Sequence, residues 1–363
     1  MKKTLLFAFL LATFAAGAQK SSTKISVIAY YAGDASSVDA YPVEMLTHII
    51  FSFCHLKGNE LHVDNMNDTI TIQHLVDLKK RNPSLKVILS IGGWGGCATC
   101  SEVFSTDKGR NEFAASVKHL NEYFNTDGID LDWEYPAIAG YEGHRYMPSD
   151  KQNFTALIKT LRHTLGNKYE ISFAAGGFGK FLHESVEWNK IAPLVDKVNL
   201  MSYDLVNGNS TVTGHHTPLY STPQQIESTD NAIRFFDSIH FPLKKIVIGA
   251  AMYGRIFNVN VDAMNGLYQP GNFDHGISWK SFDQTAMEQQ GYVYYWDDVA
   301  KAPYMYDKTL KKLFSYDNER SMSLKTQYAV DKELNGIMFW QLGDDTFSDG
   351  LLQTINTTMS KHE

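Results

Sequence analysis

Three carboxyl side chains occupy alternate positions of one short segment. Residues 127–136 read DGIDLDWEYP, in which single apolar residues separate Asp130, Asp132 and Glu134. Side chains of a β-strand alternate between its two faces, so the three carboxyls share one face and the apolar side chains share the other. Asp127 has the opposite parity and stands at the strand entrance, where we expect it to bond backbone groups. The segment predicts a strand with a row of carboxyls in front and a buried apolar face behind.

The spacing of this row predicts raised pKa values. Same-face neighbours on a strand lie ~6.5–7 Å apart at the backbone. Two full charges at that distance repel by about 2–2.5 kcal/mol at an effective dielectric of about 20. Each neighbour then raises a carboxyl pKa by roughly one to two units, and desolvation adds to this. At least one proton should be shared in the row at neutral pH, which suits glycoside hydrolysis: an acid kept protonated beside a carboxylate kept charged.

Two other interpretations of the row are weaker. A solvated edge strand would not carry Ile129, Leu131 and Trp133, which read as buried, on its other face. A metal site is disfavoured because no histidine lies at ligand spacing beside the carboxyls. We therefore expect neither a metal nor a cofactor.

The elements that must position the row alternate along the chain as strands and amphipathic helices. Eight apolar, β-branched or aromatic runs recur at 25–31, 48–53, 86–91, 128–133, 170–174, 197–202, 245–251 and 336–341. Between most of them, apolar residues recur at three- and four-residue steps, as in 113–124 and 154–161. Strands that are apolar on both faces indicate a parallel sheet covered by helices, and their number predicts an α/β fold, a (β/α)8 TIM barrel. A doubly wound open sheet is the alternative, but no G-x-G-x-x-G follows the first strand.

An additional module interrupts the barrel between its seventh and eighth strands, which are separated by far more chain than one helix needs. Residues 256–317 in this gap are dense in tyrosine and tryptophan. We expect a small α+β insertion there that raises an aromatic wall beside the cleft, with residues 19–255 and 318–363 forming the catalytic barrel and 323–334 its next helix.

The first residues predict export. Lys2 and Lys3 precede an apolar run from Leu5 to Ala16, and the small residues 16–18 match a signal-peptidase site, so residues 1–18 read as a signal peptide. A membrane anchor is less favoured because the run is shorter than the ~20 residues that span a bilayer. We expect a secreted or periplasmic protein that is not held in a membrane after cleavage.

The charge and composition of the chain limit the classes of binding partner to be expected. The chain has 33 Lys and Arg against 40 Asp and Glu, a net charge of −7, and no cluster of basic residues, so nucleic acid is not an expected partner. Aromatic residues make up 13% of the chain, a surplus that sugar-binding clefts use. Three cysteines are too few for a disulfide scaffold.

Several motifs together resemble one family. The pattern D-x-x-D-x-D-x-E at 127–134, followed by Tyr135 and Pro136, is similar to that of glycoside hydrolase family 18, its chitinases in particular. Further motifs of the family appear in the same order at 90–94 (SIGGW), 201–204 (MSYD), 253–255 (YGR) and Trp340. The likeness covers nearly the whole chain after residue 18, including the aromatic-rich insertion.

The resemblance implies roles for four catalytic residues. Glu134 would be the general acid and base. Asp132 would orient the N-acetyl group of the substrate, and Asp130 behind it would share its proton. Tyr203 would hydrogen-bond the acetamide oxygen, so the substrate itself would supply the nucleophile.

The resemblance also implies a set of binding residues. Trp340 would be the floor under the sugar at the cleaved bond, with Trp94 and Tyr135 on either side of the cleavage point. Strand ends present the site of a (β/α)8 barrel, which favours function over packing for both tryptophans. The remaining implied binding residues are Asp204 at the same sugar, Arg255 from the seventh loop, Tyr30 and Phe53 lining the pocket, Ser90 below the row, Gly93 for a sharp turn, and Met201, read mainly as packing.

The sequence leaves some points open. Cys97 and Cys100 form a C-x-x-C pattern that departs from the family; they pair with each other, or Cys54 pairs with one of them, or, less favoured, the site binds zinc with His55. Three tryptophans, Trp188, Trp279 and Trp296, have no motif and suit either the core or a cleft wall.

The function expected from these observations is a chitinase that hydrolyses β-1,4-linked N-acetylglucosamine chains with retention. Its partner is chitin or a chitooligosaccharide, and we expect a monomer. An endo-β-N-acetylglucosaminidase acting on N-glycans is one alternative, and a sugar-binding lectin without activity is another, although Glu134 is present. Endo or exo action and the natural glycan are not determined by the sequence.

Overall fold

The computed structural model describes residues 25–361, and the signal-peptide prediction falls outside them. Eight parallel strands form a closed barrel, because β1 pairs with both β14 and β2. In order around the barrel these strands are β1 (Ser26–Tyr31), β2 (His48–Lys57), β4 (Lys86–Gly92), β5 (Gly128–Asp132), β6 (Glu170–Gly176), β7 (Lys197–Met201), β8 (Ile246–Ala251) and β14 (Gly336–Trp340). A short β3 (Glu60–His62) extends β2 as an antiparallel hairpin. The predicted (β/α)8 barrel is confirmed.

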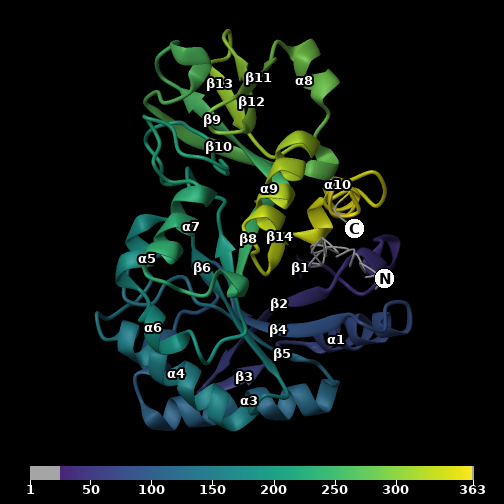
Figure 1. Ribbon diagram of the computed structural model, residues 1–363, viewed down its shortest axis with the longest axis vertical. Helices are drawn as coiled ribbons and strands as arrows, with labels where there is room; N and C mark the ends of the chain where they lie inside the picture. Colours follow the sequence, from purple (N-terminus) through teal and green to yellow (C-terminus); the bar gives the residue numbers. More distant parts are fainter. Residues whose placement is uncertain (1–24, 362–363) are drawn as a thin grey trace, which may run out of the picture.

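Helices cover the outside of the barrel (Figure 1). They are α1 (Met66–Asp77), α2 (Cys100–Phe104), α3 (Asp107–Phe124), α4 (Asp150–Leu165), α5 (Gly179–Glu184), α6 (Trp188–Ile191), α7 (Thr229–Ser238), α9 (Glu319–Asp331) and α10 (Leu351–Met359). In α3 the side chain of Thr106 caps the helix by accepting from the N–H of Gly109, and Asn125 ends it in the left-handed conformation. Its apolar face packs on the strands, as the three- and four-residue spacing predicted.

The two faces of each barrel strand pack in different environments. Ile129, Leu131 and Trp133 of the β5 segment belong to a large apolar core between strands and helices. A much smaller apolar cluster fills the barrel interior. This division puts Asp130 and Asp132 of β5 on the inside, and Glu134 follows two residues after the end of the strand.

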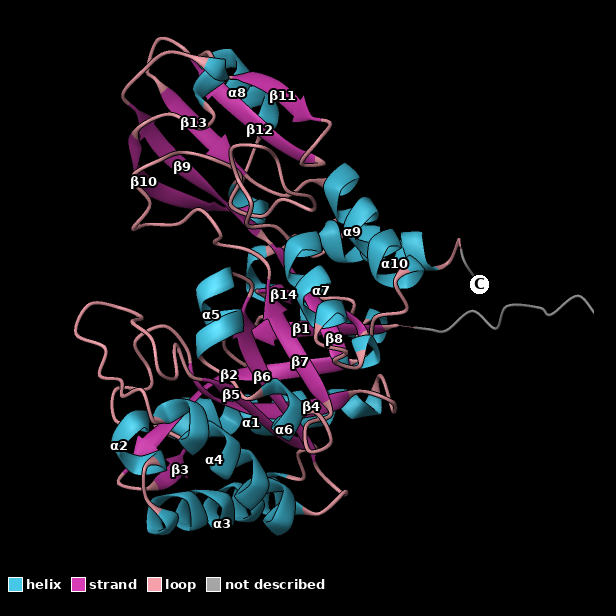
Figure 2. Cartoon of the chain, turned by 60° about the vertical axis from the view of Figure 1, so that its left-hand side comes forward, coloured by secondary structure: helices cyan, strands magenta, loops and turns pink. Residues whose placement is uncertain are grey.

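The chain between β8 and β14 forms a separate α+β module, seen at the top of Figures 1 and 2. Its five antiparallel strands run in the order β10 (Gly271–Ser278), β9 (Tyr253–Val259), β13 (Lys312–Ser315), β12 (Ala302–Asp307) and β11 (Val293–Asp297), with α8 (Gln284–Gln290) beside them. Apolar clusters cover both faces of this sheet. Because β9 begins at Tyr253, Arg255 lies in the sheet of the module, one residue before the boundary expected at 256.

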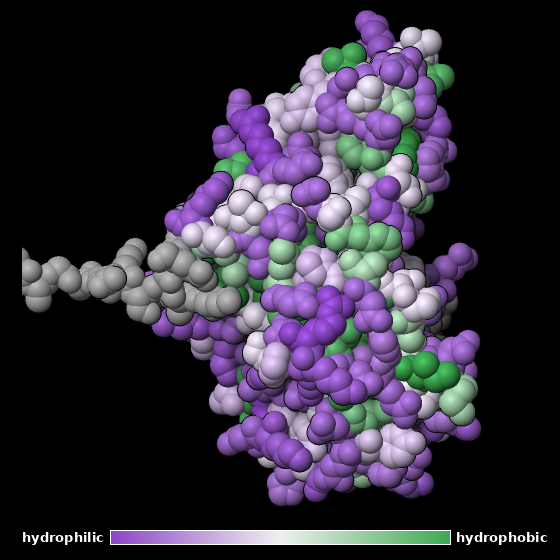
Figure 3. Space-filling model, turned by 90° about the vertical axis from the view of Figure 1, so that its right-hand side faces the viewer, coloured by the Kyte–Doolittle hydropathy of each residue, from purple (hydrophilic) through white to green (hydrophobic). Residues whose placement is uncertain are grey.

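The aromatic wall expected from the insertion is wrong. Tyr292, Tyr304 and Tyr306 are buried in the module's own apolar clusters, and Tyr294 and Tyr295 pack against those clusters. On the face seen in Figure 3, hydrophilic residues predominate and apolar side chains gather only in small patches. No helix among residues 25–361 is both long and apolar enough to cross a membrane.

Candidate active site

The carboxyl row of β5 begins inside the barrel at Asp130, which is fully buried. Four side chains donate hydrogen bonds to it. Tyr30 and Ser90 each donate to Oδ2 at 3.0 Å, while Ser172 at 2.6 Å and Asn199 at 3.0 Å donate to Oδ1. Burial raises the pKa of Asp130, and these four donors oppose the rise by stabilising its charged form. These donors hold the Asp130 side chain in one position at the inner end of the carboxyl row.

Asp132 follows on the same face and has fewer partners. Burial, and then the charges of Glu134 and Asp130, raise the pKa of Asp132 well above its usual value. Its Oδ1 is buried and has no hydrogen-bond partner within residues 25–361. A buried acceptor without a donor is costly, so this oxygen suits a donor supplied by a ligand.

Glu134 completes the row at the mouth of the barrel, with 9% of its surface exposed. Burial raises the pKa of Glu134 to about 7, the charge of Asp204 adds to the rise, and a hydrogen bond from Tyr135 opposes it. A substantial fraction of Glu134 is therefore protonated at neutral pH and most of it below neutral pH, which a general acid requires.

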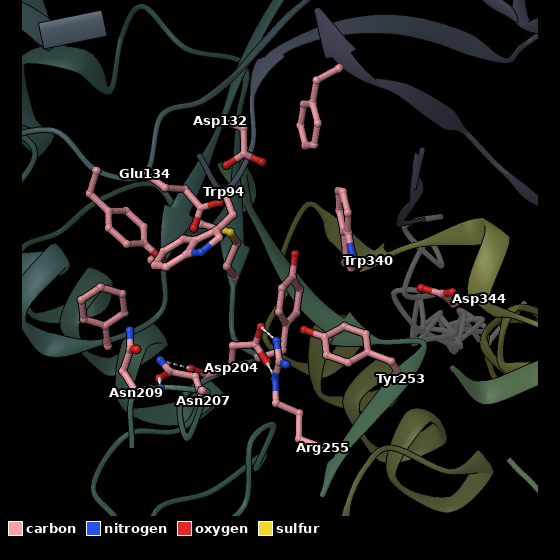
Figure 4. A pocket seen from close by; sticks show the side chains of 17 residues that line it. Trp94, Asp132, Glu134, Asp204, Asn207, Asn209, Tyr253, Arg255, Trp340 and Asp344 are labelled. Carbon is pink, nitrogen blue, oxygen red and sulfur yellow. Dashed lines mark hydrogen bonds and ion pairs between the residues drawn. The ribbon is translucent and has the colours of Figure 1, made fainter. Parts of the chain in front are cut away.

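Asp204 and Arg255 form a carboxylate–guanidinium pair in the wall of the pocket. The guanidinium of Arg255 binds both carboxylate oxygens of Asp204 (Figure 4). Burial alone would raise the pKa of Asp204, but Arg255 and the buried His216 more than offset it and hold that pKa well below its usual range. The guanidinium also lies 5.2 Å from the ring centre of Tyr253. Asp204 is thus an ionised group whose charge Arg255 neutralises.

Aromatic rings form the floor of the pocket. Trp340, the last residue of β14, stacks on Phe53 with ring centres 5.6 Å apart. Tyr30 packs against Trp340 from within the barrel, at 5.9 Å. The hydroxyl of Tyr203 lies 3.9 Å from the sulfur of Met338, a weak acceptor, so it retains most of its capacity to donate.

These groups line one pocket of about 610 Å³. It contains ten of the residues named from the sequence: Phe53, Trp94, Asp132, Glu134, Tyr135, Met201, Tyr203, Asp204, Arg255 and Trp340. Four others lie outside its lining: Asp130, Tyr30 and Ser90 are buried beneath it, and Gly93 lies against the ring of Phe53. In Figure 4, Glu134 and Trp94 lie on one side of Trp340 and Asp344 lies on the other.

Several residues of the site were not predicted. They are Gly176, Phe178, Asn207, Gly208, Asn209, Tyr253 and Asp344 in the lining, and Ser172 and Asn199 beneath it. Ser172 and Asn199 had a signal, because each is a polar residue within an otherwise apolar strand. Tyr253 stood in the quoted YGR motif, although only Arg255 was given a role.

The tryptophans left open lie away from the pocket. Trp188 is buried in the core, where its indole N–H donates to the carbonyl of Leu182 at 2.7 Å. Trp279 packs against the apolar clusters of the module and the barrel. Trp296 stacks under the guanidinium of Arg320, 3.7 Å from its ring centre.

The cysteine question is also resolved. Cys97 and Cys100 form a disulfide, while Cys54 is a buried free thiol. His55 forms an ion pair with Asp64 at 2.5 Å. Among residues 25–361, no three histidine, cysteine or acidic side chains gather in a way that could hold a metal ion. Asp127 bonds the backbone N–H of Val87 at 2.7 Å, as expected at the strand entrance.

A (β/α)8 barrel with a buried carboxyl row on its fourth strand and a protonated acid at its mouth defines a glycoside hydrolase. Comparison with known families gives the same class. Residues 26–345 match the family described as Glycosyl hydrolases family 18, and the chain belongs to this family. The resemblance seen in the sequence is confirmed.

Individual relatives are similar over most of the chain. Chitinase A1 of Niallia circulans is 35% identical over 298 residues, which are 76% of this chain and 42% of that protein, so the chain spans less than half of that relative. Chitinase 1 of Aphanocladium album is 30% identical, over 86% of this chain and 79% of that protein. The solved structure of a family 18 N-acetylglucosaminidase from Paenibacillus barengoltzii has a TM-score of 0.82 and 32% identity, covering 92% of this chain and 100% of that one.

Proposed function

We propose that this protein is an exported chitinase that hydrolyses β-1,4-linked N-acetylglucosamine chains with retention of configuration. The protonated Glu134 in the pocket carries this proposal. With a pKa of about 7, it can give its proton to the leaving glycosidic oxygen at neutral pH and then, as a carboxylate, accept one from water. The related chitinases and the related N-acetylglucosaminidase support the substrate class.

The nucleophile is the acetamido oxygen of the substrate. Retaining enzymes that use their own nucleophile hold a second carboxylate ~5–5.5 Å from the acid. Asp132 ends β5 two residues before Glu134 in the same row, Asp204 is bound by Arg255, and Asp344 lies beyond Trp340. None of them is suited to attack from the opposite face of the sugar.

The reaction then proceeds in two steps. The acetamido oxygen attacks C1 as the bond to the leaving oxygen breaks, and Glu134 protonates that oxygen. The unpartnered Oδ1 of Asp132 accepts the acetamide N–H, and the hydroxyl of Tyr203 donates to the acetamide oxygen. Water, deprotonated by Glu134, attacks C1 of the resulting oxazolinium ring and opens it, which restores the β configuration.

The other expected functions receive less support. A lectin would not need an acid with a raised pKa in its pocket. Hydrolysis of N-glycans would use the same chemistry, but the curated relatives above are named chitinases. Export agrees with the disulfide between Cys97 and Cys100, because disulfides persist in oxidising compartments.

Product analysis tests the proposal. Chitohexaose is digested, its products are identified by mass spectrometry, and the anomers are followed by NMR in the first minutes. We expect shorter oligosaccharides with β anomers first, and no turnover of fully deacetylated chitosan. An initial α anomer, or efficient cleavage of the deacetylated polymer, would overturn the mechanism. Cleavage of a glycoprotein but not of chitohexaose would replace the substrate.

A further inference from the structure

Trp94 occupies an unusually unconstrained position for a residue of the pocket. It lies on the loop between β4 and α2, in the segment GGWGG at 92–96. The N–H of Gly96 donates to the carbonyl of Gly93 at 2.9 Å, so Trp94 and Gly95 form the centre of a tight turn. Gly95 has a φ of 84°, which glycine adopts most readily. Gly92, Gly93 and Gly96 are packed closely against their neighbours, whereas Gly95 has open space around it, so the least constrained part of the segment is the turn at Trp94 and Gly95.

The side-chain contacts of Trp94 do not cover its indole. Tyr135 and Tyr141 meet the ring in edge arrangements, with centres 6.3 and 6.1 Å away. The residue is 57% exposed. Its faces are therefore available to a sugar ring, but these two edges alone do little to fix its orientation.

The next turn is held much more firmly. Cys97 and Cys100 are joined by a disulfide, and both are buried in the core between barrel and helices. Arg145 donates to the carbonyl of Ala98 at 3.1 Å and pairs with Glu102 at 2.7 Å. The turn that carries Trp94 is anchored before it by the N–H of Gly93, which donates to the carbonyl of Asp132 at 3.0 Å, and leads directly into a covalently closed turn that a second loop also contacts.

We propose that the Cys97–Cys100 disulfide is a positioning device for Trp94, which holds the indole where a sugar beyond the cleaved bond can stack. The inference rests on the proposed function, which gives Trp94 that sugar. Closing a four-residue turn removes little of the entropy of the unfolded chain, so the bond adds little to global stability and acts locally. It fixes the chain direction three residues after Trp94, where the glycines cannot.

A double-mutant cycle tests the proposal. The Cys97→Ala/Cys100→Ala variant is compared with wild type, and the same pair is then introduced into a Trp94→Ala background. On chitohexaose we expect KM to rise about two- to tenfold, the cost of ordering one large side chain on binding, with kcat changed by less than about twofold. In the Trp94→Ala background the same pair should leave KM unchanged.

The controls separate positioning from general damage. Cys54→Ala removes a buried thiol that lies on β2 and should leave KM unchanged. Arg145→Ala should reproduce the KM increase only while Trp94 is present. The proposal would be overturned if the cysteine pair raised KM equally in the Trp94→Ala background. It would also be overturned if the pair caused no rise in KM when Trp94 is present.

A second readout does not depend on hydrolysis. ¹⁵N relaxation of the Trp94 indole N–H, assigned with Trp94→Phe, should show greater mobility in the double alanine variant and not in Cys54→Ala. Unchanged mobility would overturn the positioning role even if the enzyme turns over chitohexaose. Increased mobility in a protein that cleaves no chitooligosaccharide would uphold the role of the disulfide and reject the proposed function.

Discussion

The two ends of the barrel place carboxyl groups in opposite electrostatic surroundings. At the amino ends of the strands, Glu170 binds the ammonium of Lys86, that of Lys197 at 2.8 Å, and the ring of His48 at 3.1 Å. Each of these four residues is the first of its strand. Burial alone would raise the pKa of Glu170, but His48 and Lys197 hold it well below its usual range. Burial also lowers the pKa of His48, so the positive charge comes from the two lysines.

At the carboxyl ends the surroundings are reversed. Glu134 and Asp132 face other carboxyls, and their pKa values are raised. One barrel therefore has a carboxylate that stays ionised among the strand ends it joins and, at the other end, carboxyls whose raised pKa suits proton transfer near neutral pH. The partner charges decide the difference, since both sites are largely buried. Replacing Glu134 and, in a separate variant, Glu170 with glutamine should distinguish an effect on catalysis from an effect on stability.

The largest effect should come from Glu134→Gln. The amide keeps the shape of the side chain but has no acidic proton to give the leaving oxygen, so kcat on chitohexaose should fall by at least ~10²–10⁴. Binding of the hexamer, measured by calorimetry, should persist. Glu170→Gln is the matched control, and its kcat per folded molecule should stay within about twofold of wild type. A rate within tenfold of wild type for Glu134→Gln would assign the acid elsewhere.

Asp132→Asn should follow closely. In the proposed mechanism the unpartnered Oδ1 of Asp132 accepts the acetamide N–H, and an amide in its place can present an N–H group there instead, so we expect a loss of about 10²–10³ in kcat. Because the proposed role of Asp132 is to support the substrate as nucleophile, a loss limited to KM would contradict that role. Steady-state kinetics on chitohexaose at saturating substrate distinguish the two outcomes.

Features of the fold that depend on the local pattern of residues could be predicted from the sequence. The eight strands were visible because they are buried on both faces, and the parity of 127–134 identified which carboxyls face inward. Of the partners of Asp130, Ser90 was expected to hydrogen-bond the carboxyl row from below and does so, but Ser172 and Asn199 were not predicted. Ser172 and Asn199 meet Asp130 only through the register of β5, β6 and β7, which pairs Asp130 with Ser172 and Ala174 with Asn199. Register across a barrel is a non-local property that one strand's pattern does not contain.

Loop geometry was also beyond the sequence. Asn207 and Asn209 enter the pocket because the chain turns back after β7, where Asn207 donates to the carbonyl of Asp204. The aromatic wall was wrong for a related reason. Composition reveals that tyrosines are abundant in 256–317, but not whether their rings face a cleft or pack on their own sheet.

Stability should respond to pH with opposite sign at the two ends. A lowered pKa stabilises the fold above the unfolded value of ~4.5, and this stability is lost as pH falls below it. Glu170→Gln should therefore cost about 1–3 kcal/mol at pH 7 and less at pH 3, with the difference narrowing further as pH falls through the lowered pKa of Glu170.

The raised pKa of Glu134 works in the other direction. Its protonated form fits the fold below ~4.5, and wild type loses stability as pH rises from there through about 7. Relative to wild type, the free energy of unfolding of Glu134→Gln should therefore rise by on the order of 2 kcal/mol as pH increases from 4 to 8. Urea unfolding at these pH values measures both variants. Parallel pH dependence of Glu134→Gln and Glu170→Gln would contradict the comparison.

The smallest effect should be that of Tyr203→Phe. The ring and its packing in the barrel interior remain, and only the hydroxyl is lost, which in the proposed mechanism donates to the acetamide oxygen. One hydrogen bond to a developing charge contributes about 1.5–3 kcal/mol, so kcat should fall by about ten- to a hundredfold. The substitution should lower kcat without changing the urea midpoint at pH 7. Met338 is a weak acceptor, so the loss of its donor costs the fold little. A loss as large as that of Glu134→Gln would mean that Tyr203 takes part in the proton transfer itself.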